Sequence, residues 1–248
     1  LSSARTDPVQ TPSATPRSPQ TEPLPLDVGV TQLDPKAIKQ AVRQDLGDRV
    51  WYCLQAPSQK DCYRAYKQAE LLRLESNDLN RADFSEAGLR LSFAVEREVV
   101  QPFFEALYEF SLTDGGPDIG GVSLGPGKTY TLGMMAPLIA DQWQSFNSSA
   151  LKQSAMPSPA QRYSPVTGKT GRWDRDRVQR FIDQWEHPLA DWLIQEEDAA
   201  SQIDQIGKLR NVAAHAEQPL KRWHYQRIKA LIVGSETQPG LFKQLYAQ

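Results

Sequence analysis

The stretch that decides the fold reads SEAGLRLSFAVEREVVQPFFEALYEF and covers residues 85–110. Its apolar residues recur at steps of three and four, which is the spacing of one face of an α-helix. Pro102 lies inside the stretch and is expected to kink or split the helix, because proline lacks an N–H and clashes with the preceding turn. The segment therefore predicts a long, interrupted helix with a core-facing stripe of Leu91, Val95, Val99, Phe103, Ala106 and Phe110.

The same helical spacing extends outward from this stretch to most of the chain. Asp34-Pro35 predicts a helix start, because Asp caps helices and Pro is accepted at the first helical position. No convincing strand series with a period of two is present, although residues 230–234 could form a short strand. We therefore expect an all-α fold, a helical bundle of about five to seven helices with two long loops. Further helices are expected over residues 61–75 and 129–143 and from Asp174 onward, and the loops over 113–128 and 145–172.

The N-terminal segment has a different composition. Residues 1–25 hold 6 of the 18 prolines, and Ser, Thr and Gln make up much of the rest. Such a composition predicts a disordered linker over residues 1–32, followed by one folded domain over residues 33–248. A PxxP ligand for a partner domain is an alternative. Because residue 1 is Leu, we expect the chain to be the C-terminal module of a longer protein, tethered to an upstream sensor or regulatory domain.

Composition narrows the class of protein. The 248 residues carry 28 basic and 30 acidic side chains, a net charge of −2, which argues against a polybasic coat protein or an acidic tail. No apolar run approaches the roughly 20 residues of a membrane-spanning helix, so no membrane partner is expected. Cys53 and Cys62 are too few for a disulfide scaffold or an all-cysteine zinc site. They suggest a reducing, cytoplasmic location and are expected to pack as small apolar groups.

Two nucleotide-binding patterns fail on inspection. A phosphate-binding loop needs a Gly five residues before Gly-Lys-Thr, but Val122 precedes Gly127 and Tyr163 precedes Gly168 at that distance. The histidines at 187, 215 and 224 lack the helical spacing and the carboxylate neighbours of a zinc site. We therefore expect no metal and no cofactor.

The chemistry-bearing motif is Arg210-Asn211-Val212-Ala213-Ala214-His215, of the form R-N-x-x-x-H. It resembles the signature of HEPN domains, helical bundles that include RNases of toxin–antitoxin, CRISPR-linked and other defence systems. Arg180 and His187 also have a suitable spacing, but Phe181 replaces the polar residue that should follow the Arg. The resemblance implies an endoribonuclease that cleaves single-stranded RNA without metal, leaving a 2′,3′-cyclic phosphate, and a homodimer in which two motifs face each other.

The residue types suit that reaction. RNA supplies its own nucleophile, the 2′-hydroxyl, and an imidazole can take or give a proton near neutral pH. Arginine stays charged and can bind the phosphate, so we expect Arg210 to stabilise it, His215 to act as acid or base and Asn211 to position either. A helix turns by about 100° per residue, so Asn211 and His215 share a face, whereas Arg210 lies roughly 140° from His215.

A basic stretch with aromatic residues surrounds the motif and predicts RNA binding. Planar rings can stack on bases and cations can bind phosphates. The alternative is a non-catalytic dimerisation or adaptor domain in which the same residues are structural. Exposure of the His215 side chain would favour catalysis, while burial would favour the adaptor. The RNA-binding candidates are Lys208, Lys221, Arg222, Trp223, His224 and Arg227.

Overall fold

The structure is a computed structural model that describes residues 33–215 and 218–247. The expectation of a linker over residues 1–32 lies outside the described residues. The described part is mostly helical and its strands form two short antiparallel pairs, so the predicted all-α class is confirmed. It contains more and shorter helices than the five to seven expected, because long apolar stripes are divided by turns. The elements are α1 (Pro35–Leu46), α2 (Asp48–Cys53), α3 (Ala56–Glu75), α4 (Ser85–Val95), η1 (Glu96–Val100), α5 (Gln101–Ser111), β1 (Asp118–Ile119), β2 (Val122–Ser123), α6 (Leu132–Ile139), β3 (Gln142–Phe146), α7 (Ser148–Leu151), α8 (Pro159–Arg162), β4 (Tyr163–Thr167), α9 (Arg172–Gln184), α10 (Pro188–Gln195), α11 (Ala199–Ala214), α12 (Arg222–Ile232) and α13 (Leu241–Tyr246).

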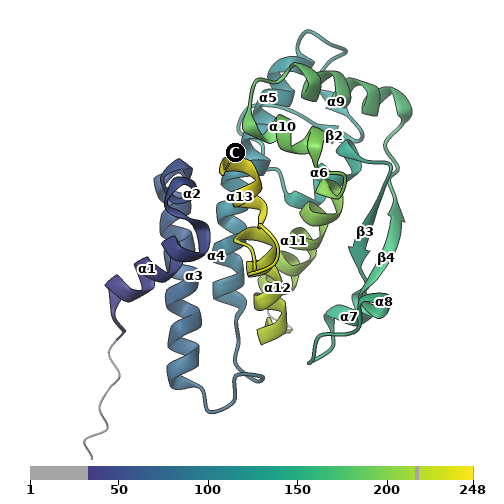
Figure 1. Cartoon of the computed structure of the whole chain (residues 1–248). Helices are drawn as coiled ribbons and strands as arrows, with labels where there is room; N and C mark the ends of the chain where they lie inside the picture. The colour runs from purple at the N-terminus through teal and green to yellow at the C-terminus, as the bar shows by residue number, and fades with distance from the viewer. Residues whose placement is uncertain (1–32, 216–217, 248) are drawn as a thin grey trace, which may run out of the picture. The chain divides into compact units, whose positions relative to one another are not determined.

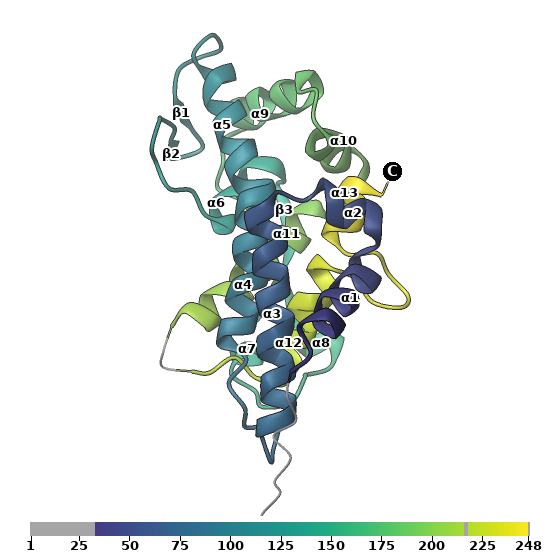
Figure 2. The same ribbon diagram turned by 90° about the vertical axis from the view of Figure 1, so that its left-hand side faces the viewer.

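Helices α3 and α4 run side by side through the middle of the domain (Figures 1 and 2). Polar contacts reinforce this pair. Asp61 on α3 is buried, and its carboxylate lies 3.4 Å from Arg90 Nη1 and 3.1 Å from Arg97 Nη1. The two arginines compensate the negative charge of this buried carboxylate. The contacts therefore help to hold α3 and α4 in a fixed position relative to each other.

The interruption predicted inside residues 85–110 takes a specific form. Helix α4, the π-helical turn η1 and helix α5 follow one another without a gap, and η1 ends two residues before Pro102. A π-turn widens the helix by one residue and changes which carbonyl faces a following proline ring. The chain therefore accommodates Pro102 by widening the helix before it, and no break occurs at the proline itself.

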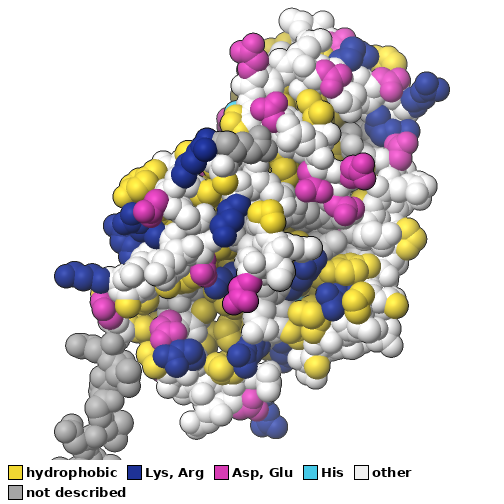
Figure 3. Space-filling model, in the orientation of Figure 1, with side chains coloured by type: hydrophobic (Ala, Val, Ile, Leu, Met, Phe, Trp, Pro, Cys, Tyr) yellow, Lys and Arg dark blue, Asp and Glu magenta, His cyan; other side chains and the backbone are white. Residues whose placement is uncertain are grey.

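No helix in residues 33–215 or 218–247 is long and apolar enough to cross a membrane. The face of the domain shown in Figure 3 mixes basic, acidic and apolar side chains. Cys53 and Cys62 are both free, but only Cys62 is buried. Burial raises the pKa of the Cys62 thiol to about 12. The prediction that both cysteines pack in the interior is thus wrong for Cys53, which is exposed at the end of α2.

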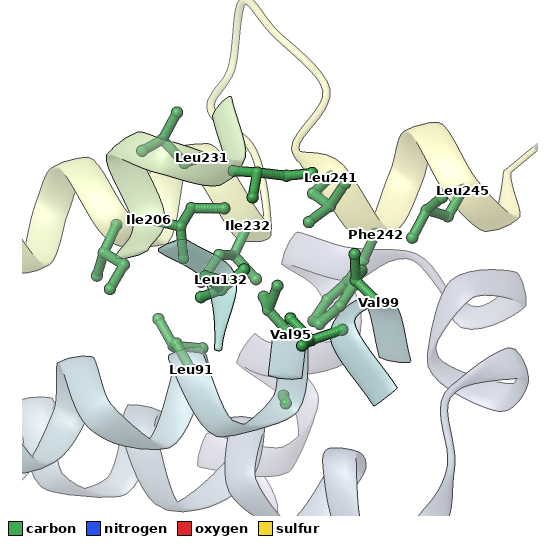
Figure 4. Close-up of a cluster of buried hydrophobic side chains, with 14 of the residues drawn as sticks. Leu91, Val95, Val99, Leu132, Ile206, Leu231, Ile232, Leu241, Phe242 and Leu245 are labelled. Atoms are coloured by element: carbon green, nitrogen blue, oxygen red, sulfur yellow. The ribbon is translucent and has the colours of Figure 1, made fainter. Parts of the chain in front are cut away.

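The core lies where the long helical run meets the C-terminal helices. Leu91, Val95 and Val99 point toward Ile232 on α12 and Phe242 on α13, and all five side chains are fully buried (Figure 4). Each such burial stabilises the fold by about 1.5–3 kcal/mol. Because α11 also contributes buried residues to this core, the end of α11 is held in a fixed place relative to α4.

The predicted loop over residues 145–172 is wrong in part. Strand β3 pairs with β4 in an antiparallel hairpin, with Gln142 opposite Thr167 and Phe146 opposite Tyr163, and α7 and α8 lie between the two strands. The helix predicted over 129–143 is correspondingly shorter, because α6 ends at Ile139 and Gln142 begins β3. The strands are short and largely polar, and for that reason their alternation gave little signal.

Two further predictions concern segments near the ends of helices. Residues 230–232 are helical, and only Gly234 forms an isolated bridge, to Pro239, so the suggested strand over 230–234 is not formed. The segment 113–128 is a loop apart from the two-residue strands β1 and β2. Its first half is held by the fully buried Arg177, whose guanidinium donates to the carbonyls of Asp114, Gly116 and Asp118.

Candidate functional site

The motif lies in the last turn of α11. The helix ends because His215 leaves the helical conformation, with φ −98° and ψ 113°, while its N–H still donates to the Asn211 carbonyl at 3.2 Å. The chain then returns to α4, where the Phe84 N–H donates to the Leu220 carbonyl and the Leu220 N–H donates to Ser85 Oγ, both at 2.9 Å. These bonds fix the chain that follows the motif.

The side chains of Asn211 and His215 are both exposed. Ala213, between them in sequence, is buried, and its Cβ lies 3.9 Å from the position that a Cβ on Gly88 of α4 would take. The small residues at 213 and 88 therefore let α11 approach α4 of the same chain closely. Ala214, in contrast, is exposed beside His215. His215 thus has the accessibility that an acid or base needs, and its imidazole is not packed in the core.

Arg210 has a partner that sequence reasoning missed. Its Nε donates to Glu96 Oε1 at 3.1 Å, and both side chains are partly exposed, with exposed fractions of 29% and 23%. Glu96 is the first residue of the π-turn η1 and lies 114 residues from Arg210 along the chain. No local pattern signals such a distant pair. The guanidinium is therefore paired with a carboxylate. To bind a phosphate, it must either contact Glu96 and the phosphate at the same time or release Glu96.

A cavity of about 1000 Å³ lies beside Glu96. It is bordered by η1, α5 and the loop at 125–130, and Glu96 is among its lining residues. Lys128, from the first Gly-Lys-Thr pattern, also lines it, but the Lys128 ammonium donates to Ser123 of its own loop at 2.8 and 2.9 Å. Lys128 thus forms its hydrogen bonds within its own loop, in agreement with the prediction that the Gly-Lys-Thr pattern at 127–129 is part of a loop.

The aromatic residues of the basic stretch do not form an RNA-stacking surface. Trp223 and His224 are 5% and 1% exposed, and Tyr225 is also buried. Trp223 Nε1 donates to the Gln153 carbonyl, and His224 Nδ1 accepts the Lys221 N–H. Burial lowers the pKa of His224 to about 4. The prediction that Trp223 and His224 contact RNA is therefore wrong, because both side chains belong to the interior.

The basic residues of the stretch are divided between two places. Lys208 and Arg222 are exposed and Lys221 is half-buried, whereas Arg227 is half-buried and donates from Nη2 to Gln205 Oε1 at 3.0 Å. Figure 2 shows the end of α11 at the left edge of the domain and α12 to the right of α4. Lys221 caps α12 and Arg222 and Arg227 belong to it, whereas Lys208 and Arg210 are the cations that α11 itself supplies.

Among the described residues, no group of three or more His, Cys, Asp or Glu side chains could hold a metal ion. Comparison of the chain with protein-family models, with curated proteins and with solved structures gives no match. The resemblance to HEPN domains accordingly rests on residues 210–215 and on the helical class of the fold.

Proposed function

We propose that this chain is an endoribonuclease of HEPN type that cleaves single-stranded RNA without a metal ion. The observation that carries the proposal is the joint exposure of Asn211 and His215 at a helix end whose position is fixed by α4. A buried imidazole would have favoured a structural role, and His215 is not buried. In this proposal the chain is the effector module of a larger defence or stress-response protein.

In the proposed reaction His215 removes the proton from a ribose 2′-hydroxyl. The 2′-oxygen attacks the adjacent phosphorus, and the bond from phosphorus to the 5′-oxygen breaks as a second imidazole gives that oxygen a proton. The products are a 2′,3′-cyclic phosphate and a 5′-hydroxyl. Arg210 would bind the phosphate oxygens as charge builds on them, and Asn211 would orient the imidazole or the phosphate.

One feature supports a site completed by a second copy of the chain. One motif supplies one imidazole, whereas the reaction uses a base and an acid. A second motif facing the first would add another imidazole and another arginine to the same phosphate.

A second candidate function is favoured by the contact between Arg210 and Glu96. An arginine that joins α11 to η1 at 3.1 Å can be a purely structural residue, as expected for a non-catalytic dimerisation or adaptor domain. The two functions differ in what they require of His215, because only catalysis needs its imidazole.

The test compares the purified chain with His215→Ala on end-labelled single-stranded RNA in the presence of EDTA. We expect the substitution to lower the cleavage rate by about 10²–10⁴-fold, the usual contribution of an acid–base residue. Gln218→Ala is the matched control, since Gln218 is exposed three residues away and has no assigned role. A DNA strand of the same sequence should resist cleavage, because it lacks the 2′-hydroxyl.

Equal cleavage by the wild type and His215→Ala, or cleavage of the DNA strand, would contradict the proposal. Absence of cleavage by either protein, at concentrations where the chain is dimeric, would favour the adaptor.

A further inference from the structure

A second cavity, of about 530 Å³, lies away from the motif. It is formed where α11, α12 and the hairpin of β3 and β4 meet the segment that leads into α13. Its size falls within the range of small-molecule sites in proteins. Most of its lining is polar, and the residues that carry the argument below are Tyr163, Glu196, Asp198, Gln205 and Arg227.

The central feature of this cavity is the guanidinium of Arg227. Arg227 Nη2 donates to Gln205 Oε1, and Gln205 is 6% exposed, so the amide is held in the wall. Arg227 Nε is buried and has no hydrogen-bond partner in the described part of the chain. Within residues 33–215 and 218–247, no carboxylate lies within 4 Å of this guanidinium. A half-buried arginine without a carboxylate is a place where an anionic group is stabilised.

A second donor lies on the hairpin side. The Tyr163 hydroxyl, at the start of β4, is buried and has no hydrogen-bond partner among the described residues. A phenol and a guanidinium that line one cavity suit a carboxylate, which accepts hydrogen bonds at two oxygens.

The other part of the lining has the opposite charge. Glu196 and Asp198 lie at the junction of α10 and α11, and Glu196 Oε1 accepts the Asp198 N–H at 3.2 Å. On the face shown in Figure 3, acidic side chains gather at the height of this junction, with basic side chains lower on the same face. Neither carboxylate forms an ion pair with Arg227. The cavity therefore presents a cation and two carboxylates that do not neutralise one another by direct contact.

This distribution selects among ligands. A polyanion such as RNA would meet repulsion from Glu196 and Asp198, and a simple amine would leave Arg227 without an anion. We propose that the cavity binds a small zwitterion, an amino acid with a cationic side chain, with its carboxylate at Arg227 and a cationic group at Glu196 and Asp198. This site is separate from the proposed nuclease motif and does not depend on it.

The test uses isothermal titration calorimetry of the full chain with L-lysine and with cadaverine, which is L-lysine without its carboxylate. We expect L-lysine to bind at least about tenfold more tightly, because only L-lysine offers Arg227 an anion. Arg227→Met should weaken L-lysine binding by about tenfold or more and leave cadaverine unchanged. Arg222→Met is the matched control, since Arg222 is an exposed arginine on the same helix and does not line the cavity.

Glu196→Gln provides a second variant if Arg227→Met unfolds, and it should weaken the binding of both ligands. Thermal unfolding of each variant checks that the fold is retained. The proposal is overturned if L-lysine and L-arginine give no binding up to about 10 mM. Equal affinities for L-lysine and cadaverine, or undiminished L-lysine binding in the folded variants, would overturn it as well.

Discussion

Two demands are made of the Arg210 side chain, one structural and one catalytic. Its contact with Glu96 joins α11 to the π-turn η1, and the proposed reaction also requires it at a phosphate. These demands are compatible, because a guanidinium has five N–H donors and the contact with Glu96 uses Nε. The remaining donors can reach a phosphate while Glu96 holds the orientation. The pair is thus a stabilising contact that also positions the cation.

A double-mutant cycle on Arg210 and Glu96 tests the structural part of this argument. We expect Arg210→Ala and Glu96→Gln each to lower the free energy of unfolding by about 1 kcal/mol, a modest value because both side chains are partly exposed. The double variant should lose less than the sum of the two, since one contact is removed in each case. Urea unfolding gives the free energy of unfolding of all four proteins. If the losses of the two single variants simply add in the double variant, the contact contributes nothing to stability.

His224 makes stability depend on pH. Burial lowers its pKa to about 4 in the folded chain, against 6.5 for an ordinary histidine. Above pH 6.5 both states keep the imidazole neutral and the stability is fully present. As the pH falls from 6.5 toward 4, the unfolded chain binds the proton first, so the free energy of unfolding decreases by up to about 3 kcal/mol.

His224→Asn isolates this effect, because Asn retains an acceptor near the Lys221 N–H and does not titrate. The variant should be less stable than the wild type at pH 7.5, where it leaves a gap, but its stability should fall less between pH 6.5 and pH 5. Denaturant unfolding at several pH values gives both slopes. Parallel slopes in the two proteins would contradict the role assigned to His224.

At the residue scale, part of the candidate site can be predicted from the sequence. In α12, positions 224, 228, 231 and 232 follow the spacing of a buried helix face, so the same residues that suggested base stacking also carried a core pattern. The burial of His224 was thus predictable. The partner of Arg210 was not, because Glu96 comes from a distant helix and only the tertiary packing brings the two together.

Helices were easier to predict than the hairpin. The stripes of α1, α4 and α5 extend over several turns, and each turn repeats the signal. Strands β3 and β4 have five residues each, and β4 contains Pro165, so neither shows a long alternation. Their pairing also spans a segment with two short helices, α7 and α8. The hairpin depends on contacts between residues about twenty positions apart, which local patterns do not encode.

The turn that leads into α13 provides a prediction at the level of an element. A Cβ on Gly240 would lie 2.3 Å from Gly234 N and 2.4 Å from the carbonyl carbon of Val233, and backbone atoms cannot move aside as a side chain can. Gly240→Ala should therefore destabilise the domain by about 3 kcal/mol or more. Gly171→Ala is the control, because nothing lies within 4 Å of its Cβ position, and as the N-cap of α9 it should lose no more than about 1 kcal/mol. Similar losses in both variants would show that the turn is not tightly packed.

At the scale of the whole molecule, the fold orients the motif outward. The helix end that bears Asn211 and His215 is held against α4 from inside, by buried Ala213 and by the hydrogen bonds of Leu220. The exposed side chains therefore face solvent or another molecule. One copy of the chain provides a single exposed imidazole at this place, and this geometry is why the proposed reaction calls for two copies.

Dependence on chain concentration tests that requirement. If two motifs form one site, cleavage per chain should fall on dilution below the dissociation constant of the dimer, because the rate then follows the square of the chain concentration. Cleavage of labelled RNA is measured over a dilution series, and analytical ultracentrifugation gives the dimer fraction at the same concentrations. His215→Ala added in excess should inhibit the wild type by forming mixed dimers with one imidazole, whereas Gly240→Ala, if unfolded, should not inhibit. A rate per chain that stays constant while the dimer dissociates would mean that one motif suffices, and the second imidazole would have to be replaced by water as the acid.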